Sequence, residues 1–255
     1  MTILDNIIAC KRREVAALRD AGYYRRFENA VRTRSCSMSR ALSESGTGII
    51  AEFKRRSPSK GDIHPMAMVA DIVPGYEAAG AAACSVLTDT PFFGGSVTDL
   101  AVARSCAALP LLRKEFIVHP CQITEAAAFG ADAVLLIASV LTYGEICEFT
   151  ETAHFYGMEV LLEIHGYDEL GKIAATADMI GVNNRNLKNF HTDIAMASAI
   201  IADLPGEAVK VAESGLKTMD EIRALRSAGY RGFLIGETFM KAASPAEALS
   251  ELLKQ

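Results

Sequence analysis

The sequence predicts an α/β fold, a single (β/α)8 barrel of the TIM-barrel type with a helical extension at its amino terminus. From Ile49 onward, short apolar runs alternate with longer amphipathic or Ala-rich segments, which is typical of strands and helices in a parallel sheet. Eight such runs can be counted, and the 255 residues slightly exceed the roughly 250 of a bare barrel. We therefore expect residues 1–48 to form the extension and residues 49–255 the barrel, within one domain.

The eight apolar runs are the expected strands. They cover residues 49–53, 83–88, 110–116, 133–138, 159–164, 179–183, 208–214 and 233–236. Four of the intervening helical segments end in a glycine, which favours a helix stop; these glycines are Gly80, Gly130, Gly157 and Gly229. A doubly wound sheet would show the same alternation, but eight repeats favour a barrel, and no strand is followed by G-x-G-x-x-G.

Residues 1–48 do not follow this alternation. Apolar residues at helical spacing predict two helices laid against the barrel; they are Ile7, Ile8, Val15 and Leu18. We expect the extension to close the amino-terminal end of the barrel or to brace its side. The alternative is that part of it covers the mouth of the active site.

Composition excludes several classes of protein. Half of the residues are hydrophobic and 22% are charged, so a long disordered stretch is not expected. A net charge of -5 and a pI of about 5.6 argue against nucleic acid as a partner. Charged residues interrupt the apolar amino terminus before a signal peptide or membrane span is complete, which predicts a cytoplasmic protein without membrane attachment.

The six cysteines are far apart in the sequence. They form no C-x-x-C pair, and no histidine lies beside them at the spacing of metal ligands, so no metal site is predicted. We expect them to be buried small apolar residues in a reducing compartment.

Polar residues at the carboxyl ends of the strands are the main candidates for chemistry. Side chains alternate along a strand, and the last inward-facing position borders the active-site mouth of a barrel. Glu52 and Lys54 share the inward side with Ile50 and lie about 7 Å apart along the strand, so they are expected to pair. By the same alternation, the other inward candidates are Lys114, Glu163, Asn183, Arg185 and Glu213.

Taken singly, each of these residues is more simply interpreted as a solvated strand end. Five of the eight strands, however, bring an ionisable or amide side chain to one mouth, where burial and mutual charge shift pKa values. This combination favours a catalytic site. Lys210 falls on the outward side of an apolar strand, and the sequence offers no explanation for it.

Glycines after the last two strands predict a phosphate site. Ser214 and Gly215 follow the seventh strand, and Gly236 and Glu237 follow the eighth, each shortly before a helix. In such barrels, backbone N–H groups and a helix amino terminus at these two loops commonly bind phosphate. Ser57 in the first loop adds a hydroxyl group.

These residues together resemble the indole-3-glycerol phosphate synthase family. The matching segments include IIAEFKRRSPSKG, LLRKEFIVHPCQI, GMEVLLEIH and FLIGETFM, and further matches cover nearly the whole barrel in order. The family's amino-terminal helical extension corresponds to residues 1–48. Two departures are a Lys-Glu-Phe in the third loop, where Lys-Asp-Phe is more usual, and Glu237, where relatives often have serine.

The resemblance implies conversion of 1-(2-carboxyphenylamino)-1-deoxyribulose 5-phosphate into indole-3-glycerol phosphate, with loss of CO2 and water and without a cofactor. It implies that Lys114 is the general acid of ring closure, Glu163 a general base, and Lys54 the proton donor to the leaving hydroxyl. Glu52 corresponds to a carboxylate that orients and charges these lysines. Asn183 and Glu213 complete the polar ring.

The resemblance also implies the substrate contacts. Arg185 is expected beside the substrate's carboxylate. The apolar residues around the anthranilate ring are expected to be Phe93, Phe116, Leu187 and Leu234. The phosphate is expected at Ser57, Ser214, Gly215 and Gly236, with Glu237 contributing its backbone N–H.

Two other functions stay open at this point. One is a sugar-phosphate isomerase on the same barrel, such as phosphoribosylanthranilate isomerase, which is expected to use a cysteine and an aspartate at opposite strand ends. The other is a non-catalytic phosphate-ligand sensor, which would not require the set of lysines and glutamates. We expect a small-molecule phosphorylated anthranilate sugar as the partner, and a monomer or weak homo-oligomer.

Overall fold

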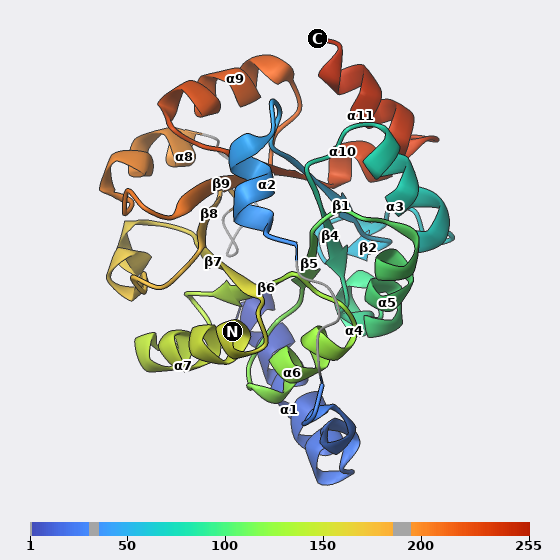
Figure 1. The fold of residues 1–255 in the computed structure, drawn as a ribbon, viewed down its shortest axis with the longest axis vertical. Coiled ribbons are helices and arrows are strands. Elements are labelled where there is room, and N and C mark those ends of the chain that lie inside the picture. The colour runs from blue at the N-terminus through green and yellow to red at the C-terminus, as the bar shows by residue number, and fades with distance from the viewer. Residues whose placement is uncertain (1, 31–35, 186–194) are drawn as a thin grey trace.

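A closed barrel of eight parallel strands forms the centre of the chain (Figure 1). The computed structural model describes residues 2–30, 36–185 and 195–255. The barrel strands are β1 (Ile49–Phe53), β4 (Ala83–Leu87), β5 (Leu111–Lys114), β6 (Ala133–Ile137), β7 (Glu159–Ile164), β8 (Met179–Asn183), β9 (Val209–Glu213) and β10 (Gly232–Ile235). The first loop contains a short antiparallel pair, β2 (Arg56–Ser57) and β3 (Gly61–Asp62).

Helices surround the strands (Figure 1). The α-helices are α1 (Ile3–Asp20), α2 (Met38–Glu44), α3 (Val69–Ala78), α4 (Thr90–Phe93), α5 (Val97–Cys106), α6 (Cys121–Ala128), α7 (Tyr143–Phe155), α8 (Ala195–Ile200), α9 (Met219–Ala228), α10 (Glu237–Met240) and α11 (Pro245–Leu253). Three 3-10 helices also occur, η1 (Tyr23–Phe27), η2 (Tyr167–Lys172) and η3 (Ile201–Asp203).

The predicted barrel is confirmed, and its strands lie within about two residues of the expected ranges. Closure comes from β1, which pairs in parallel with both β4 and β10. The largest boundary difference is in β5, which ends at Lys114 and leaves Glu115 and Phe116 in the following loop. The four predicted helix-stop glycines follow α3, α6, α7 and α9, and all four have positive φ.

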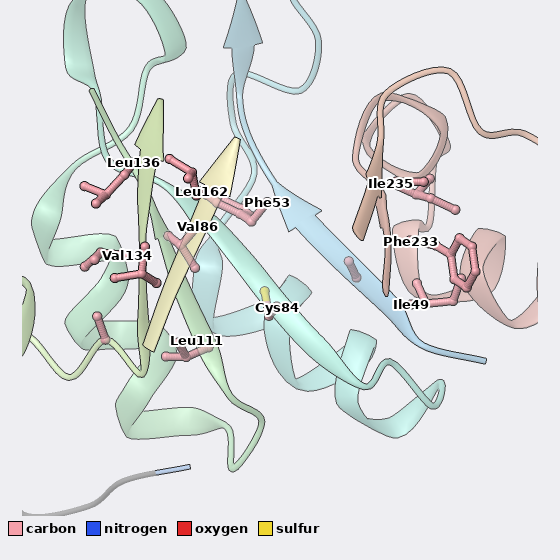
Figure 2. Close-up of a cluster of buried hydrophobic side chains, with 14 of the residues drawn as sticks. Ile49, Phe53, Cys84, Val86, Leu111, Val134, Leu136, Leu162, Phe233 and Ile235 are labelled. Carbon is pink, nitrogen blue, oxygen red and sulfur yellow. The ribbon is translucent and has the colours of Figure 1, made fainter. Parts of the chain in front are cut away.

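Two apolar layers explain why these strands close. Along a strand, residues of one buried cluster alternate with residues of another, as Ile50 does with Ile49 and Ala51. The outer cluster includes helix residues such as Leu100, and Figure 2 shows side chains of this cluster on the barrel strands, among them Ile49, Val86 and Leu162. The inner cluster therefore fills the barrel interior, and residues that share its side of a strand, including Lys114, point inward.

The helix α2 closes the amino-terminal end of the barrel. Met38 and Leu42 are fully buried within the inner cluster, and Figure 1 shows α2 lying across the ring of strands. Glu159, the first residue of β7, accepts hydrogen bonds from the Ser37 and Ser39 hydroxyls (both 2.7 Å) and from the Ser39 backbone N–H (2.9 Å). These bonds fix the start of α2 to the strand beneath it.

The helix α1 reaches the opposite end of the barrel. The Nζ atom of Lys11 lies 3.0 Å from Asp89 Oδ2 and 3.2 Å from Glu115 Oε1, just beyond the carboxyl ends of β4 and β5. All three side chains are nearly inaccessible to solvent. Ile3, Leu4 and Ile7 of the same helix line the large cavity there, so the extension lies at both ends of the barrel.

The prediction of buried cysteines is wrong for five of the six, because only Cys84 is buried and the others are half-buried. Cys10, Cys106 and Cys147 belong to helices that pack by one face and leave the edges of that face partly exposed.

Lys210, for which the sequence offered no explanation, donates to the Gly206 carbonyl (2.8 Å). This hydrogen bond accounts for a charged residue at the start of β9.

No helix within the described residues is both long enough and apolar enough to span a membrane.

Replacing Leu42 with Ala should lower the free energy of unfolding by about 2–5 kcal/mol, because it opens a cavity beneath the barrel that rigid strands cannot fill. The measurement is urea denaturation followed by circular dichroism. Leu42→Met is the matched control and should cost less than about 1.5 kcal/mol. An equal loss in both variants would show that α2 does not stabilise the barrel by packing.

Candidate active site

A cavity of about 1190 Å³ opens at the carboxyl ends of the barrel strands. Fifteen of the sixteen residues predicted for the site line it: Glu52, Lys54, Ser57, Phe93, Lys114, Phe116, Glu163, Asn183, Arg185, Glu213, Ser214, Gly215, Leu234, Gly236 and Glu237. The sixteenth, Leu187, lies outside the described residues. The alternation of side chains along each strand, together with the common direction of parallel strands, brings this set to one end of the barrel.

Lys114 lies between two carboxylates on the floor of the cavity. Its Nζ atom is 2.8 Å from Glu163 Oε2 and 2.6 Å from Glu213 Oε2. Burial lowers the pKa of Lys114, but the carboxylates of Glu163 and Glu213 outweigh burial and hold that pKa above its ordinary value. Lys114 is therefore an ammonium ion at neutral pH and can donate protons.

The two carboxylates that share Lys114 differ in protonation. Burial and the neighbouring Glu163 charge raise the pKa of Glu213 to about 8, although Lys114 opposes the shift. Burial also acts to raise the pKa of Glu163, but Lys114 and His165 outweigh it and hold that pKa well below its ordinary value. Near neutral pH, Glu163 is thus ionised, while Glu213 holds a proton more readily than an ordinary carboxyl group.

A second pair lies at the end of β1, as the spacing of Glu52 and Lys54 predicts. Lys54 Nζ donates to Glu52 Oε1 at 2.6 Å, and both side chains are mostly shielded from solvent. Gly236 makes room for this carboxylate, because a Cβ atom there would lie 2.4 Å from Glu52 Oε1. The glycine is needed here for space between neighbouring strands.

Gly181 has the same function beside Glu213. It lies on β8, and a Cβ atom at this position would be 2.1 Å from Glu213 Oε1. Gly181 was not predicted as a site residue from the sequence, although a glycine at an inward position of a strand indicates close approach by another group.

His165 and Glu169 form an outer layer behind Glu163, and the sequence analysis did not assign them either. His165 Nε2 lies 3.2 Å from Glu163 Oε1, and His165 Nδ1 lies 3.5 Å from Glu169 Oε2. The geometry is that of ion pairs rather than of linear hydrogen bonds. Burial lowers the pKa of His165, but the two carboxylates outweigh it and raise that pKa to about 10. His165 shares the inward side with Glu163, and this was the available sequence signal.

Arg185 and Asn183 continue the polar lining beyond β8. The Asn183 side-chain oxygen accepts the backbone N–H of Arg185 (3.0 Å). The Arg185 guanidinium donates to Ser59 Oγ (3.1 Å) and pairs with Glu237 Oε2 (3.2 Å). Ser59 and the side chain of Glu237 were not among the predicted contacts of Arg185.

The predicted phosphate residues lie together at another part of the cavity wall. The Ser57 hydroxyl is buried and has no hydrogen-bond partner among the described residues. Ser214 and Gly215 both have positive φ, 64° and 84°, an uncommon conformation for serine. Gly236 directly precedes α10, whose first residue is Glu237.

The three predicted apolar residues that the structure describes, Phe93, Phe116 and Leu234, also line the cavity. The rings of Phe93 and Phe116 lie 6.0 Å apart, and Leu234 projects from β10 into the same cavity. Asp89 Oδ1 accepts the backbone N–H groups of Phe92 (2.7 Å) and Phe93 (3.3 Å), which fixes α4. Glu115 Oε1 accepts the Phe116 N–H (2.8 Å). The carboxylates that bind Lys11 of the extension therefore also hold the two aromatic residues.

Within the described residues, no group of three or more His, Cys, Asp or Glu side chains is placed so that it could hold a metal ion.

Comparison with known sequences identifies close relatives. The sequence profile described as indole-3-glycerol phosphate synthase matches residues 4–252. An indole-3-glycerol phosphate synthase of Bacteroides thetaiotaomicron is 50% identical over 254 residues, covering 99% of this chain and 98% of the relative. The protein of the same name from Koribacter versatilis is 43% identical, with 98% of each chain covered.

Two solved structures that align with this chain at low sequence identity share its fold. An N-acetylmannosamine-6-phosphate 2-epimerase from Clostridium perfringens aligns with a TM-score of 0.62 at 11% identity, covering 89% of this chain and 99% of that one. A thiamine phosphate pyrophosphorylase from Pyrococcus furiosus aligns with a TM-score of 0.60 at 15% identity, covering 86% and 96%. Both likenesses support the barrel architecture.

Gly181→Ala should lower the free energy of unfolding by about 1–3 kcal/mol, because its Cβ would overlap the buried Glu213 carboxylate. Gly171→Ala is the matched control, since a Cβ there would meet no heavy atom within 4 Å. Urea denaturation of both variants tests this. Equal stability of the two would contradict the packing argument.

His165→Gln should destabilise the chain in a pH-dependent manner. Because its pKa in the folded state is about 10, above the ordinary 6.5, protonation of His165 stabilises folding. That contribution is complete below pH 6.5 and is lost as the pH rises through about 10. We expect the variant to be less stable than the original chain by about 1–3 kcal/mol at pH 6. Urea midpoints measured from pH 6 to 10.5 should converge, and a constant gap would refute the ion-pair assignment.

Proposed function

The chain belongs to the indole-3-glycerol phosphate synthase family, and on that basis we propose which of its residues carry out the reaction. The enzyme is a carbon–carbon lyase that converts 1-(2-carboxyphenylamino)-1-deoxy-D-ribulose 5-phosphate into indole-3-glycerol phosphate, with loss of CO2 and water, in tryptophan biosynthesis. Family membership favours this reaction over sugar-phosphate isomerisation.

The observation that carries the proposal is the position of Lys114 between Glu163 and Glu213 on the cavity floor. A buried lysine held cationic by two carboxylates is a proton donor with a fixed position. A second lysine, Lys54, is paired with Glu52 in the same cavity. The reaction has to protonate the same oxygen twice, first as the ketone oxygen and then as the leaving hydroxyl group, and two separately held lysines suit that requirement.

Ring closure is assigned to Lys114. The anthranilate ring carbon that bears the carboxylate attacks the ketone carbon, and negative charge develops on the ketone oxygen. The Lys114 ammonium group stabilises this charge and protonates the oxygen, which becomes a hydroxyl group. Departure of the carboxylate as CO2 returns its bonding electrons to the ring.

Dehydration is assigned to Lys54 and Glu163. Lys54 protonates the hydroxyl group, which leaves as water, and Glu163 removes the proton whose loss completes the indole ring. The low pKa of Glu163 keeps it ionised for this step. Glu52 orients Lys54 through their hydrogen bond, while Glu213 and Asn183 complete the polar ring.

Three groups of side chains are assigned to binding. Arg185 binds the substrate carboxylate, because a planar guanidinium matches a carboxylate with two parallel hydrogen bonds. The anthranilate ring packs on Phe93, Phe116, Leu187 and Leu234. The phosphate is bound by Ser57, Ser214, Gly215, Gly236 and the backbone N–H of Glu237; the unpartnered Ser57 hydroxyl supports this assignment.

We further propose that residues 1–48 act as part of a single domain with the barrel. The buried Lys11 contacts and the packing of α2 support this. We also propose that the protein is a cytoplasmic monomer or weak homo-oligomer. It is proposed to have no affinity for nucleic acid, and the net charge of -5 supports this last point.

Lys114→Met should lower kcat by about 10²–10⁴-fold, because the general acid of ring closure is removed. The assay follows indole fluorescence as substrate is consumed, with the product mass checked by mass spectrometry. Lys210→Met, at the start of β9, is the control and should retain turnover. Undiminished activity of the Lys114 variant would refute its role, whereas an original chain that makes no product would refute the proposed reaction.

A further inference from the structure

Arg185 is already paired with a carboxylate of its own chain. Its Nη2 atom lies 3.2 Å from Glu237 Oε2, while Nη1 donates to Ser59 Oγ at 3.1 Å. About a quarter of each charged side chain is exposed, 22% for Arg185 and 24% for Glu237, so the contact lies at the cavity wall and is accessible from it. A ligand carboxylate that approaches Arg185 must therefore compete with Glu237.

Glu237 has a second cation within reach. Its Oε1 atom lies 2.7 Å from Lys241 Nζ, one helical turn further along the chain. Burial acts to raise the pKa of Glu237, but Lys241 and Arg185 outweigh it and lower that pKa. The carboxylate is therefore ionised, and if it leaves Arg185 it stays paired with Lys241.

The other acidic residues of the cavity wall are engaged elsewhere. Glu163 and Glu213 pair with Lys114, and Glu52 pairs with Lys54. Glu115 pairs with Lys11, and Glu221 accepts backbone N–H groups at the start of α9. Within the described residues, Glu237 is the carboxylate that forms an ion pair with Arg185.

The reaction itself changes the charge that Arg185 meets. The substrate carries two anionic groups, the phosphate and the anthranilate carboxylate. The product keeps the phosphate, but the carboxylate has left as CO2. A group that competes only for the carboxylate site therefore opposes binding of the substrate and does not oppose binding of the product.

We propose that Glu237 competes with the substrate carboxylate for Arg185, releases Arg185 but stays paired with Lys241 when substrate binds, and pairs with Arg185 again once the carboxylate has left as CO2. This inference rests on the proposed function, in which Arg185 binds the substrate carboxylate. Glu237 thereby weakens binding of the substrate, whose carboxylate meets Arg185. It does not weaken binding of the product, which has no carboxylate there. It acts on Arg185 as an internal competitor and takes no part in proton transfer.

The test compares two unreactive probes. One is the substrate with its ketone reduced to an alcohol, which keeps both anionic groups. The other is the same reduced compound made from aniline, which keeps the phosphate and lacks the carboxylate. Dissociation constants of both are measured by titration calorimetry for the original chain, Glu237→Gln and Lys241→Met, after circular dichroism has shown that the variants are folded.

Glu237→Gln should bind the carboxylate-bearing probe about two- to five-fold more tightly, the size expected from loss of a partly exposed ion pair. The carboxylate-free probe, whose phosphate is bound by the backbone N–H of Glu237, should tighten by a clearly smaller factor. Lys241→Met leaves Glu237 with Arg185 as its remaining partner and should weaken binding of the carboxylate-bearing probe. KM for the substrate should follow the same order in the three proteins.

Equal tightening of both probes in Glu237→Gln would overturn the proposal, since Glu237 would then act by repelling the phosphate. Unchanged affinity for both probes would overturn it as well. A chain that turns over the substrate while showing either result keeps the proposed function and loses this inference. If the original chain neither binds the probes nor forms product, the proposed function itself is wrong.

Discussion

Two carboxylates inside the barrel share one lysine, and much of the surrounding structure depends on this contact. Lys114 on β5 meets Glu163 on β7 and Glu213 on β9, at 2.8 and 2.6 Å. Two buried carboxylates so close together repel each other, and the repulsion contributes to raising the pKa of Glu213 to about 8. Removal of the lysine would take the counter-charge from Glu213 and one of two counter-charges from Glu163, which is why a buried cluster of this kind tolerates little change.

Other residues of the barrel interior leave room for this cluster and balance part of its charge. Gly181 and Gly236 leave room for the carboxylates of Glu213 and Glu52, where any Cβ atom would overlap an oxygen. His165, itself 3.5 Å from Glu169, supplies a second positive charge to Glu163. Glu163 therefore stays ionised even while Lys114 donates its proton, and a base and an acid can function side by side.

The amino-terminal extension couples the barrel core to the mouth of the cavity. α2 fills the amino-terminal end with Met38 and Leu42, while α1 places Lys11 against Asp89 and Glu115 at the other end. Since these two carboxylates also hold the backbone of Phe93 and Phe116, the position of α1 is linked to the apolar wall of the site. α2 thus closes the amino-terminal end, which was one of the expected roles, whereas α1 lies at the mouth of the cavity, which was the alternative considered for the extension.

The sequence by itself determined the strands and the residues that face the cavity. Side chains alternate strictly along a strand, and parallel strands end together, so the inward positions of Glu52, Lys54, Lys114, Glu163 and Glu213 follow from local pattern alone. The pairing of Glu52 with Lys54 was also predictable, because both lie on one strand.

Only the tertiary structure decided the other partners. Lys114 meets carboxylates that lie 49 and 99 residues further along the chain, and Arg185 meets Glu237 52 residues away. Such contacts depend on the stagger between neighbouring strands and on the paths of the loops, which side-chain alternation does not specify. The need for Gly181 and the position of the extension at both ends of the barrel have the same cause, because each depends on atoms that only closure of the barrel brings together.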